Sequence, residues 1–421
     1  MRFRYLLLVV VLLILGSTLL RSSNKEKEVS AALARALQAE DEKDIQKAVA
    51  EALSMMGDRA GIPEVEDEYL PVPEDASLLS KAEAMAAMQP HFSRVERQRF
   101  WRIGVDPSTL TAPLRAPASV MACMMAVHRA KLDGHEQALP IARDAAEFLL
   151  WAQEQAGAGC YPFPAARGTS SDRAMQVATR FLERAEAAGK LADTVRNGWA
   201  FEDHGDGGLQ FDNGECGVAM FEYHELTRDE RFLRSSKAAA DWAMARPLCP
   251  NWNYNSFSVN LLAKAFQVTG EQKYLDAAWK KARLGVLPGQ LTTGPRAGRW
   301  MDAHNARPAY HYIMLSALAR LAAVLPADSA ERAQVTQSLK LGLIARNREI
   351  VEHGIMNKDK PTECLLLVRG VFGSDAPFMK ETFTTGALDA LSRLVSYQAR
   401  EGRLPLGPRG WGEWLEWRVG R

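Results

Sequence analysis

A short turn motif occurs twice in this chain, 42 residues apart. The first copy runs from Thr227 to Leu233 (TRDERFL) and the second from Thr269 to Leu275 (TGEQKYL). Apolar residues at helical spacing precede and follow each copy, so each reads as the turn of a helical hairpin. A hairpin that repeats at this period predicts an array of helical hairpins.

The rest of the chain follows the same pattern. The expected hairpins are 118–132 with 137–154, 214–226 with 230–246, 256–268 with 272–284, 308–325 with 330–352 and 362–371 with 378–398, and 77–99 would supply part of a sixth. Strand signals are weak, and the apolar run 365–368 fits a buried helix better than a strand. The chain is therefore predicted to be all-α.

Short turns alternate with long loops along the chain. The long loops cover 156–171, 191–213, 247–255, 287–307 and 357–361, and they are rich in Gly, Trp, Tyr, Asn, Asp and His. In an array of hairpins the short turns gather on one face and the long loops on the other. We therefore expect one functional face, on the side of the long loops.

An apolar run of 16 residues, from Tyr5 to Leu20, follows Arg2 and Arg4. Its length lies between that of a signal-peptide core and that of a short membrane span. We expect an uncleaved signal anchor over 1–21, a transmembrane helix followed by a helical stalk and linker over 22–60 and a globular body over 61–421. The body would then be extracytoplasmic, and periplasmic if the source is Gram-negative. A cleaved signal, which would give a secreted protein, is the alternative.

The charge balance and the cysteines exclude several kinds of function. With 52 basic and 51 acidic residues the formal charge is +1, so no overall field favours nucleic acid. The five cysteines are scattered without a C-x-x-C pair, so no metal site is expected. Whether Cys160 and Cys249 pair is left open, as is the oligomeric state. No phosphate-binding loop, dinucleotide fingerprint, nucleophile elbow or H-E-x-x-H motif occurs, so no cofactor is expected.

The two turns, with the segments 150–153 (LWAQ), 159–163 (GCYPF) and 307–312 (RPAYHY), resemble a known superfamily. This is the six-hairpin α/α-barrel group of glycan-active proteins, which includes glycoside hydrolases, unsaturated-uronyl hydrolases and polysaccharide lyases. The segment 307–312 is similar to one in the helical domain of glucuronyl epimerases. The resemblance covers roughly Ala118 to Gln398. It implies a six-hairpin α/α barrel (toroid) over 61–421 and a carbohydrate substrate, and it transfers no catalytic residue.

Three polar segments could carry chemistry. The first is the Gly-rich loop 202–212, whose carboxylates and histidine could act as acid or base or bind sugar hydroxyls: Glu202, Asp203, His204, Asp206 and Gln210. Asp212 in the same loop is well placed to cap the following helix instead. The loop also faintly resembles a calcium loop, but the remaining ligand spacing is missing.

The second segment alternates aromatic and amide side chains, in Trp252, Asn253 and Tyr254. Aromatic faces stack on sugar rings while amides pair with hydroxyls, so this loop suits a sugar subsite. Its other interpretation is a loop whose Asn residues make turns and a helix cap.

The third segment, 299–312, combines a cation, aromatics, a carboxylate and two histidines: Arg299, Trp300, Asp302, His304, Tyr310 and His311. Hydrolysis would pair Asp206 with Asp302 as acid and base, with Trp252, Tyr254 and Trp300 as stacking surfaces. Lyase or epimerase chemistry would use Tyr310 or His311 as base, with Arg299 neutralising a uronate.

A different class of function is a non-catalytic glycan-binding or scaffold subunit of an envelope polysaccharide system. The same aromatic and Asn loops would bind sugar there, while the acids would serve as helix caps. A terpene-cyclase-like toroid has less support, because no D-x-D-D run is present. In the tail, Trp411, Trp414 and Trp417 are spaced by three residues and are expected to pack the C-terminus against the barrel.

Overall fold

The computed structural model describes residues 31–32, 35, 44, 47, 51, 69–97, 101, 106–110, 112–132, 135–167, 173–203, 207–249, 251–300, 305, 307–355, 358–403 and 406–419. The predicted signal anchor over 1–21 and most of the predicted stalk over 22–60 lie outside these residues. Among the helices that are described, none combines the length and the apolar character that a membrane crossing requires.

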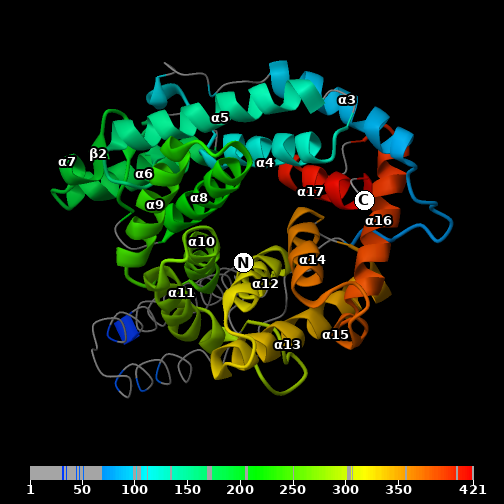
Figure 1. Ribbon diagram of the computed structural model, residues 1–421. Helices are drawn as coiled ribbons and strands as arrows, with labels where there is room; N and C mark the ends of the chain where they lie inside the picture. Colours follow the sequence, from blue (N-terminus) through cyan, green and yellow to red (C-terminus); the bar gives the residue numbers. More distant parts are fainter. Residues whose placement is uncertain are drawn as a thin grey trace, which may run out of the picture.

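An inner ring of helices surrounds the axis of the molecule (Figure 1). Within the described residues it consists, in ring order, of α4 (Arg115–Arg129), α8 (Gly208–Thr227), α10 (Trp252–Thr269), α12 (Pro308–Val324), α14 (Asp359–Phe372) and α17 (Pro408–Val419). Each packs against the next, and α17 packs against α4 to close the ring. Residues on nearly every side of α4, α10 and α12 are buried, as expected of helices that are covered all round.

An outer layer of helices covers the ring (Figure 1). It contains α5 (His135–Ala156), α9 (Glu230–Ala245), α11 (Gln272–Gly285), α13 (Ala330–His353), α16 (Thr384–Arg400), which follows the short α15 (Pro377–Glu381), and α3 (Lys81–Arg97). Helices α5, α9, α11, α13 and α16 each pack on the inner helix that precedes them in the chain. Helix α3 contacts α16 and α17, so an N-terminal helix and the C-terminal helix make the sixth hairpin. The predicted six-hairpin α/α barrel is confirmed.

The repeated turn has the same hydrogen bonds in both copies. The hydroxyls of Thr227 and Thr269 each donate to the carbonyl four residues earlier and accept from the backbone N–H two residues later. Arg228 and Gly270 occupy the left-handed region that ends a helix, with φ of 60° and 69°. Phe232 and Tyr274 are fully buried after the turn. The sequence repeat therefore encodes one capping device that is used twice.

Three connections from an outer helix to the next inner helix are long, namely those from α3 to α4, from α5 to α8 and from α11 to α12. The longest holds α6 (Arg173–Ala187), α7 (Leu191–Thr194) and a small antiparallel sheet in the order β1 (Phe163–Pro164), β3 (Trp199–Ala200), β2 (Val195–Arg196). Two short 3₁₀ turns, η2 (Pro107–Thr109) and η3 (Leu287–Gly289), lie in other connections. The N-terminal ends of the inner helices consequently share one face with the long loops.

Four inner helices begin earlier than the sequence predicted, namely α4, α8, α10 and α14, and the difference is largest for α8 and α10. Helix α8 starts at Gly208 because the Asp203 carboxylate accepts a hydrogen bond from the backbone N–H of Leu209, at 2.8 Å. Helix α10 starts at Trp252 because the Asn251 side chain accepts from the backbone N–H of Asn253, at 3.2 Å. The residues 208–212 and 252–255 are therefore helical and not part of loops.

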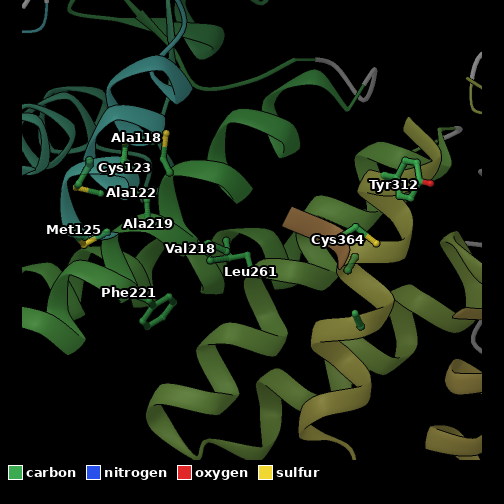
Figure 2. Packing of buried hydrophobic residues seen from close by; sticks show 14 of the residues in the cluster. Ala118, Ala122, Cys123, Met125, Val218, Ala219, Phe221, Leu261, Tyr312 and Cys364 are labelled. Atoms are coloured by element: carbon green, nitrogen blue, oxygen red, sulfur yellow. The ribbon is translucent and has the colours of Figure 1, made fainter. Parts of the chain in front are cut away.

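Small residues let the inner helices approach closely. Figure 2 shows Ala118 and Ala122 of α4 near Ala219 of α8, with Leu261 of α10 beyond them. A Cβ added at Gly217 would lie 2.6 Å from a methyl of Leu261. In the tail, Trp411 and Trp414 are fully buried and stacked with ring centroids 5.3 Å apart. The predicted packing of the tail against the barrel is confirmed.

Substituting Gly412 tests the closure of the ring by α17. A Cβ there would lie 2.6 Å from the Cα of Cys123 on α4, and a backbone atom cannot move aside as a side-chain end can. We expect Gly412→Ala to lower the free energy of unfolding by about 1–3 kcal/mol in a urea titration. The matched control is Gly370→Ala in α14, which meets nothing within 4 Å. Equal stability of the two variants would contradict this packing.

Candidate active site

A cavity of about 290 Å³ lies at the N-terminal ends of four inner helices, α4, α8, α14 and α17. Its lining comes from the first turns of these helices and the residues just before them: Pro113, Arg115, Ala116, Ser119, Phe211, Glu215, Asp359, Lys360, Glu363, Gly407, Arg409, Gly410 and Glu413. A cavity near the small end of the ligand-pocket range suits a sugar-sized group. It opens on the face of the long loops, where the functional face was expected.

Arg409 lies at the centre of a cluster of carboxylates. Its guanidinium nitrogens lie 2.9 Å from Glu413, 3.4 Å from Glu222, 3.5 Å from Glu363 and 3.8 Å from Glu215. The Arg409 side chain is only 9% exposed, so these interactions are weakly screened. One cation therefore holds carboxylates from α8, α14 and α17 at the wall of the cavity.

Lys360 is the second cation of the cluster. Its ammonium donates to Glu215 at 2.8 Å and lies 3.7 Å from Glu363. Both carboxylates also line a smaller space of about 10 Å³, together with Ser256, Phe257, Asn260, Ile313 and Ser316 of α10 and α12. This space is polar and is about the size of one water molecule. It extends the polar site from the cavity to the neighbouring inner helices α10 and α12.

Two of the cavity carboxylates have pKa values shifted in opposite directions. Burial raises the pKa of Glu413 to about 8, and the attraction of Arg409 only partly opposes this. Burial acts on Glu215 as well, but the charges of Lys360 and Arg409 outweigh it and lower the pKa of that carboxyl. Near neutral pH Glu413 is mainly protonated while Glu215 is ionised. Such a pair is what acid and base catalysis by two carboxyl groups requires.

The Glu413 carboxyl has one oxygen in use and one without a partner. Oε1 accepts from Nε of Arg409, whereas Oε2 has no hydrogen-bond partner among the residues that the structure describes. The side chain as a whole is 21% exposed and lines the cavity, but Oε2 itself is buried. A protonated carboxyl with an unused oxygen can donate a hydrogen bond to a bound group once a rotation of the side chain turns that oxygen toward the cavity.

Arg115 and Phe211 form another wall. The Arg115 guanidinium donates to Asp212 at 2.8 Å and lies 4.3 Å from the centroid of the Phe211 ring, which stacks on Phe257 at 4.1 Å. Asp212 is fully buried, and burial raises its pKa to about 6 against the opposing charge of Arg115. Asp212 thus anchors Arg115 from within α8, in place of the helix-cap role considered from the sequence.

Comparison with solved structures identifies the architecture. A glycosyl hydrolase family 88 protein from Bacteroides vulgatus superposes with a TM-score of 0.50 at 10% identity, covering 81% of this chain and 98% of that one. The chain has the six-hairpin α/α-barrel fold. A polysaccharide lyase gives a TM-score of 0.47 at 11% identity, covering 81% of this chain and 96% of that one. An unsaturated glucuronyl hydrolase specific for heparin gives a TM-score of 0.30 at 10% identity, covering 90% of this chain and 100% of that one. No family model and no curated protein matches the sequence.

Several residues predicted from the sequence lie outside the described part of this six-hairpin barrel. They are His204, Asp206, Asp302 and His304. The predicted pairing of Asp206 with Asp302 therefore stays a prediction. Within the described residues, no group of three His, Cys, Asp or Glu side chains is arranged to hold a metal ion.

Glu202 and Asp203 form ion pairs with one arginine. Arg246 donates to Glu202 at 2.6 and 2.7 Å and also contacts Asp203, whose second oxygen caps α8. Gln210 is buried and accepts from the Ser258 hydroxyl at 2.6 Å. These three residues connect the loop to α8, α9 and α10, and none lines the cavity.

The two tryptophans predicted as stacking surfaces are buried. A Cβ at Gly289 would lie 2.6 Å from both Trp252 and Trp300, and the Trp300 indole donates to the Val286 carbonyl at 2.8 Å. Asn253 is buried and donates to Asn305 at 2.8 Å, while Tyr254 is half-buried beside Phe211. Contacts of Trp252 with Trp300 around Gly289, and of Asn253 with Asn305, pack the described residues of the connection after α11 onto α10.

His311 and Arg299 lie between α12 and α13. His311 is fully buried, accepts from Nε of Arg346 at 3.2 Å and meets the Trp300 ring edge-on, and burial with the charge of Arg346 lowers its pKa. Arg299 forms an ion pair with Glu349, and burial lowers its pKa to about 10. Tyr310 is half-buried at the start of α12. None of these three lines the cavity, and their catalytic roles stay predictions.

The cavity residues that were not predicted from the sequence have one sequence feature in common. Lys360, Glu363, Arg409 and Glu413 are charged residues on inner helices whose other positions are largely apolar or small. A charge is costly inside a helix that is covered all round, so such a charge must be paired or face a cavity. Counting charges on the predicted inner helices, and not only in the loops, would have pointed to these positions.

Proposed function

We propose that this protein hydrolyses a glycosidic bond in the cavity at the N-terminal ends of the inner helices. The observation that carries the proposal is the pair of carboxyls with opposed pKa shifts, Glu413 and Glu215, in one sugar-sized cavity. Glycoside hydrolysis needs one protonated and one ionised carboxyl on either side of the scissile bond. The fold shared with a glycosyl hydrolase is consistent with this reading but does not by itself assign a reaction.

In the proposed reaction Glu413 is the general acid. A rotation of the side chain first exposes Oε2, whose proton then moves to the glycosidic oxygen as the bond to the anomeric carbon breaks, and the leaving sugar departs neutral. Arg409 stays bound to Oε1 and stabilises the carboxylate that results. A water molecule then adds its oxygen to the anomeric carbon and gives a proton to the Glu413 carboxylate, which restores the acid.

Glu215 is the ionised partner. Its negative charge stabilises the positive charge that develops at the anomeric carbon, and Lys360 and Arg409 keep it ionised. Because Glu215 and Glu413 contact the same guanidinium, their carboxyls lie within about 10 Å of each other, so the separation does not exceed the longest that glycosidases use.

Product analysis separates hydrolysis from the elimination chemistry considered from the sequence. The full chain is incubated with a panel of polysaccharides and 4-nitrophenyl glycosides, while reducing ends and ultraviolet absorbance are followed together. Hydrolysis predicts new reducing ends without the absorbance of unsaturated uronate. Growth of that absorbance would replace hydrolysis by elimination, and binding without any product would favour the scaffold hypothesis.

The pH profile gives a second test. Turnover is expected to fall as the pH rises through about 8, because Glu413 loses the proton that the reaction consumes. On the acid side, turnover is expected to persist below the ordinary carboxyl range, because the lowered pKa of Glu215 keeps it ionised. The matched control is Glu416→Gln, one turn along α17, which should leave the alkaline limb unchanged. An alkaline limb that is absent in wild type would contradict the assignment of Glu413.

We propose further that the apolar run from Tyr5 to Leu20 anchors the enzyme to a membrane, with the barrel on the extracytoplasmic side. The full chain is then expected in the membrane fraction after carbonate washing, and a variant lacking 1–21 in the soluble fraction. A full chain that washes off with carbonate would contradict the anchor.

A further inference from the structure

We propose that the cavity selects sugars that carry a protonated amino group over sugars that carry a carboxylate. The inference rests on the proposed function, because it names the substrate class of the same site. It follows from the ion pairs that the cations lining the cavity already form with carboxylates of the protein.

Each cation of the cavity lining is already bound to carboxylates of the protein. Arg115 donates to Asp212 at 2.8 Å, and Lys360 donates to Glu215 at 2.8 Å. Arg409 is in contact with four carboxylates, as described above. At Lys360 and Arg409 a uronate would have to compete with these internal partners, and their replacement would leave buried carboxylates uncompensated. Arg115 is 40% exposed and has further N–H donors, but its charge is already offset by the buried Asp212.

The carboxylates of the site outnumber its cations. Four of them line the cavity (Glu215, Asp359, Glu363 and Glu413) against three cations (Arg115, Lys360 and Arg409). With Glu413 protonated the lining charges balance, and the buried Asp212 behind Arg115 leaves an excess of negative charge. An anionic substrate therefore enters a site that is already negative, whereas an ammonium group reduces the imbalance.

Asp359 supplies a specific place for the ammonium group. Its Oδ1 accepts from the backbone N–H of Gly407 at 2.6 Å, and no described cation lies within ion-pair distance of its carboxylate. Burial raises the pKa of Asp359, although the charges of Lys360 and Lys358 oppose it. An ammonium has three donors and can bind Asp359 and still reach another oxygen of the lining.

Binding of matched probes to the full chain tests the selectivity. Methyl glucosides and galactosides are compared with their 6-amino-6-deoxy analogues and with the corresponding methyl uronides, which differ only at C6; methyl glucosaminides place the amine at C2. Calorimetry at pH 6.5 and low salt is expected to give at least tenfold tighter binding of an amino sugar than of the uronide of the same configuration. Asp359→Asn is expected to reduce that ratio at least threefold, because the charge is lost while the acceptor for Gly407 is kept.

The outcomes separate this inference from the proposed function. If a uronide binds as tightly as its amino analogue or more tightly, the selectivity is wrong while the sugar site stands. If the preference for the amine is present but unchanged in Asp359→Asn, the amine is not recognised at the proposed place and the inference fails in that form. If no probe binds, the proposed sugar site falls, and the inference falls with it.

Discussion

Replacing Glu413 with Gln is expected to lower kcat on a 4-nitrophenyl glycoside by about 10²–10⁴-fold, because the reaction loses its proton donor. The substitution keeps the shape of the side chain and its contact with Arg409, so little change in KM is expected. The measurement is steady-state turnover at pH 6.5, where wild-type Glu413 is protonated.

The leaving group distinguishes an acid from a residue that merely shapes the site. A 2,4-dinitrophenyl glycoside needs little protonation, so Glu413→Gln should recover most of its turnover on that substrate. Glu215→Gln should lose turnover on both substrates, because the charge at the anomeric carbon is not stabilised in either case. Glu416→Gln is the control on the same helix. Equal losses for Glu413→Gln on both leaving groups would contradict the acid role.

Replacing Arg409 with Met is expected to have the largest effect on stability. It leaves four carboxylates clustered without their shared cation, and breaking a buried charge network in this way costs about 3–5 kcal/mol. Urea unfolding monitored by circular dichroism measures the loss. The matched control is Arg129→Met on α4, whose partner Glu416 is 36% exposed, so that pair contributes about 1 kcal/mol or less.

A second substitution keeps this prediction testable if Arg409→Met does not fold. Adding Glu222→Gln and Glu363→Gln removes two of the uncompensated charges and should restore part of the stability. If Arg409→Met lowers the free energy of unfolding no more than Arg129→Met does, Arg409 does not hold the carboxylate cluster together, and the assignment of this role to Arg409 is wrong.

Much of the fold could be predicted because its determinants are local. The Thr227 and Thr269 turns each contain their own caps within a few residues, and apolar spacing marks the helices on either side. The helix starts were harder to place. Helix α8 begins at Gly208 only because Asp203 folds back onto the N–H of Leu209, and α10 begins at Trp252 because Asn251 caps it. Both caps lie in segments whose composition resembles a loop.

The candidate site was less predictable because it depends on distant pairings. Arg409 and Glu215 are 194 residues apart in the sequence, and Arg115 meets Asp212 from a different hairpin. The long loops are rich in polar residues and were expected to hold the site, yet Trp300 is a buried packing residue, and Trp252 and His311 are buried in the first turns of α10 and α12. The charges on inner helices give the better signal, because only pairing or a cavity lets a charge remain inside a barrel.

A crystal structure of Glu413→Gln bound to the glycoside that wild type cleaves fastest tests most directly whether this cavity is the active site. Sugar density is expected in the cavity between α4, α8, α14 and α17. The glycosidic oxygen should lie within hydrogen-bond distance of Gln at position 413, and the anomeric carbon should face Glu215. Sugar bound against another part of the long-loop face, with the cavity empty, would contradict the claim.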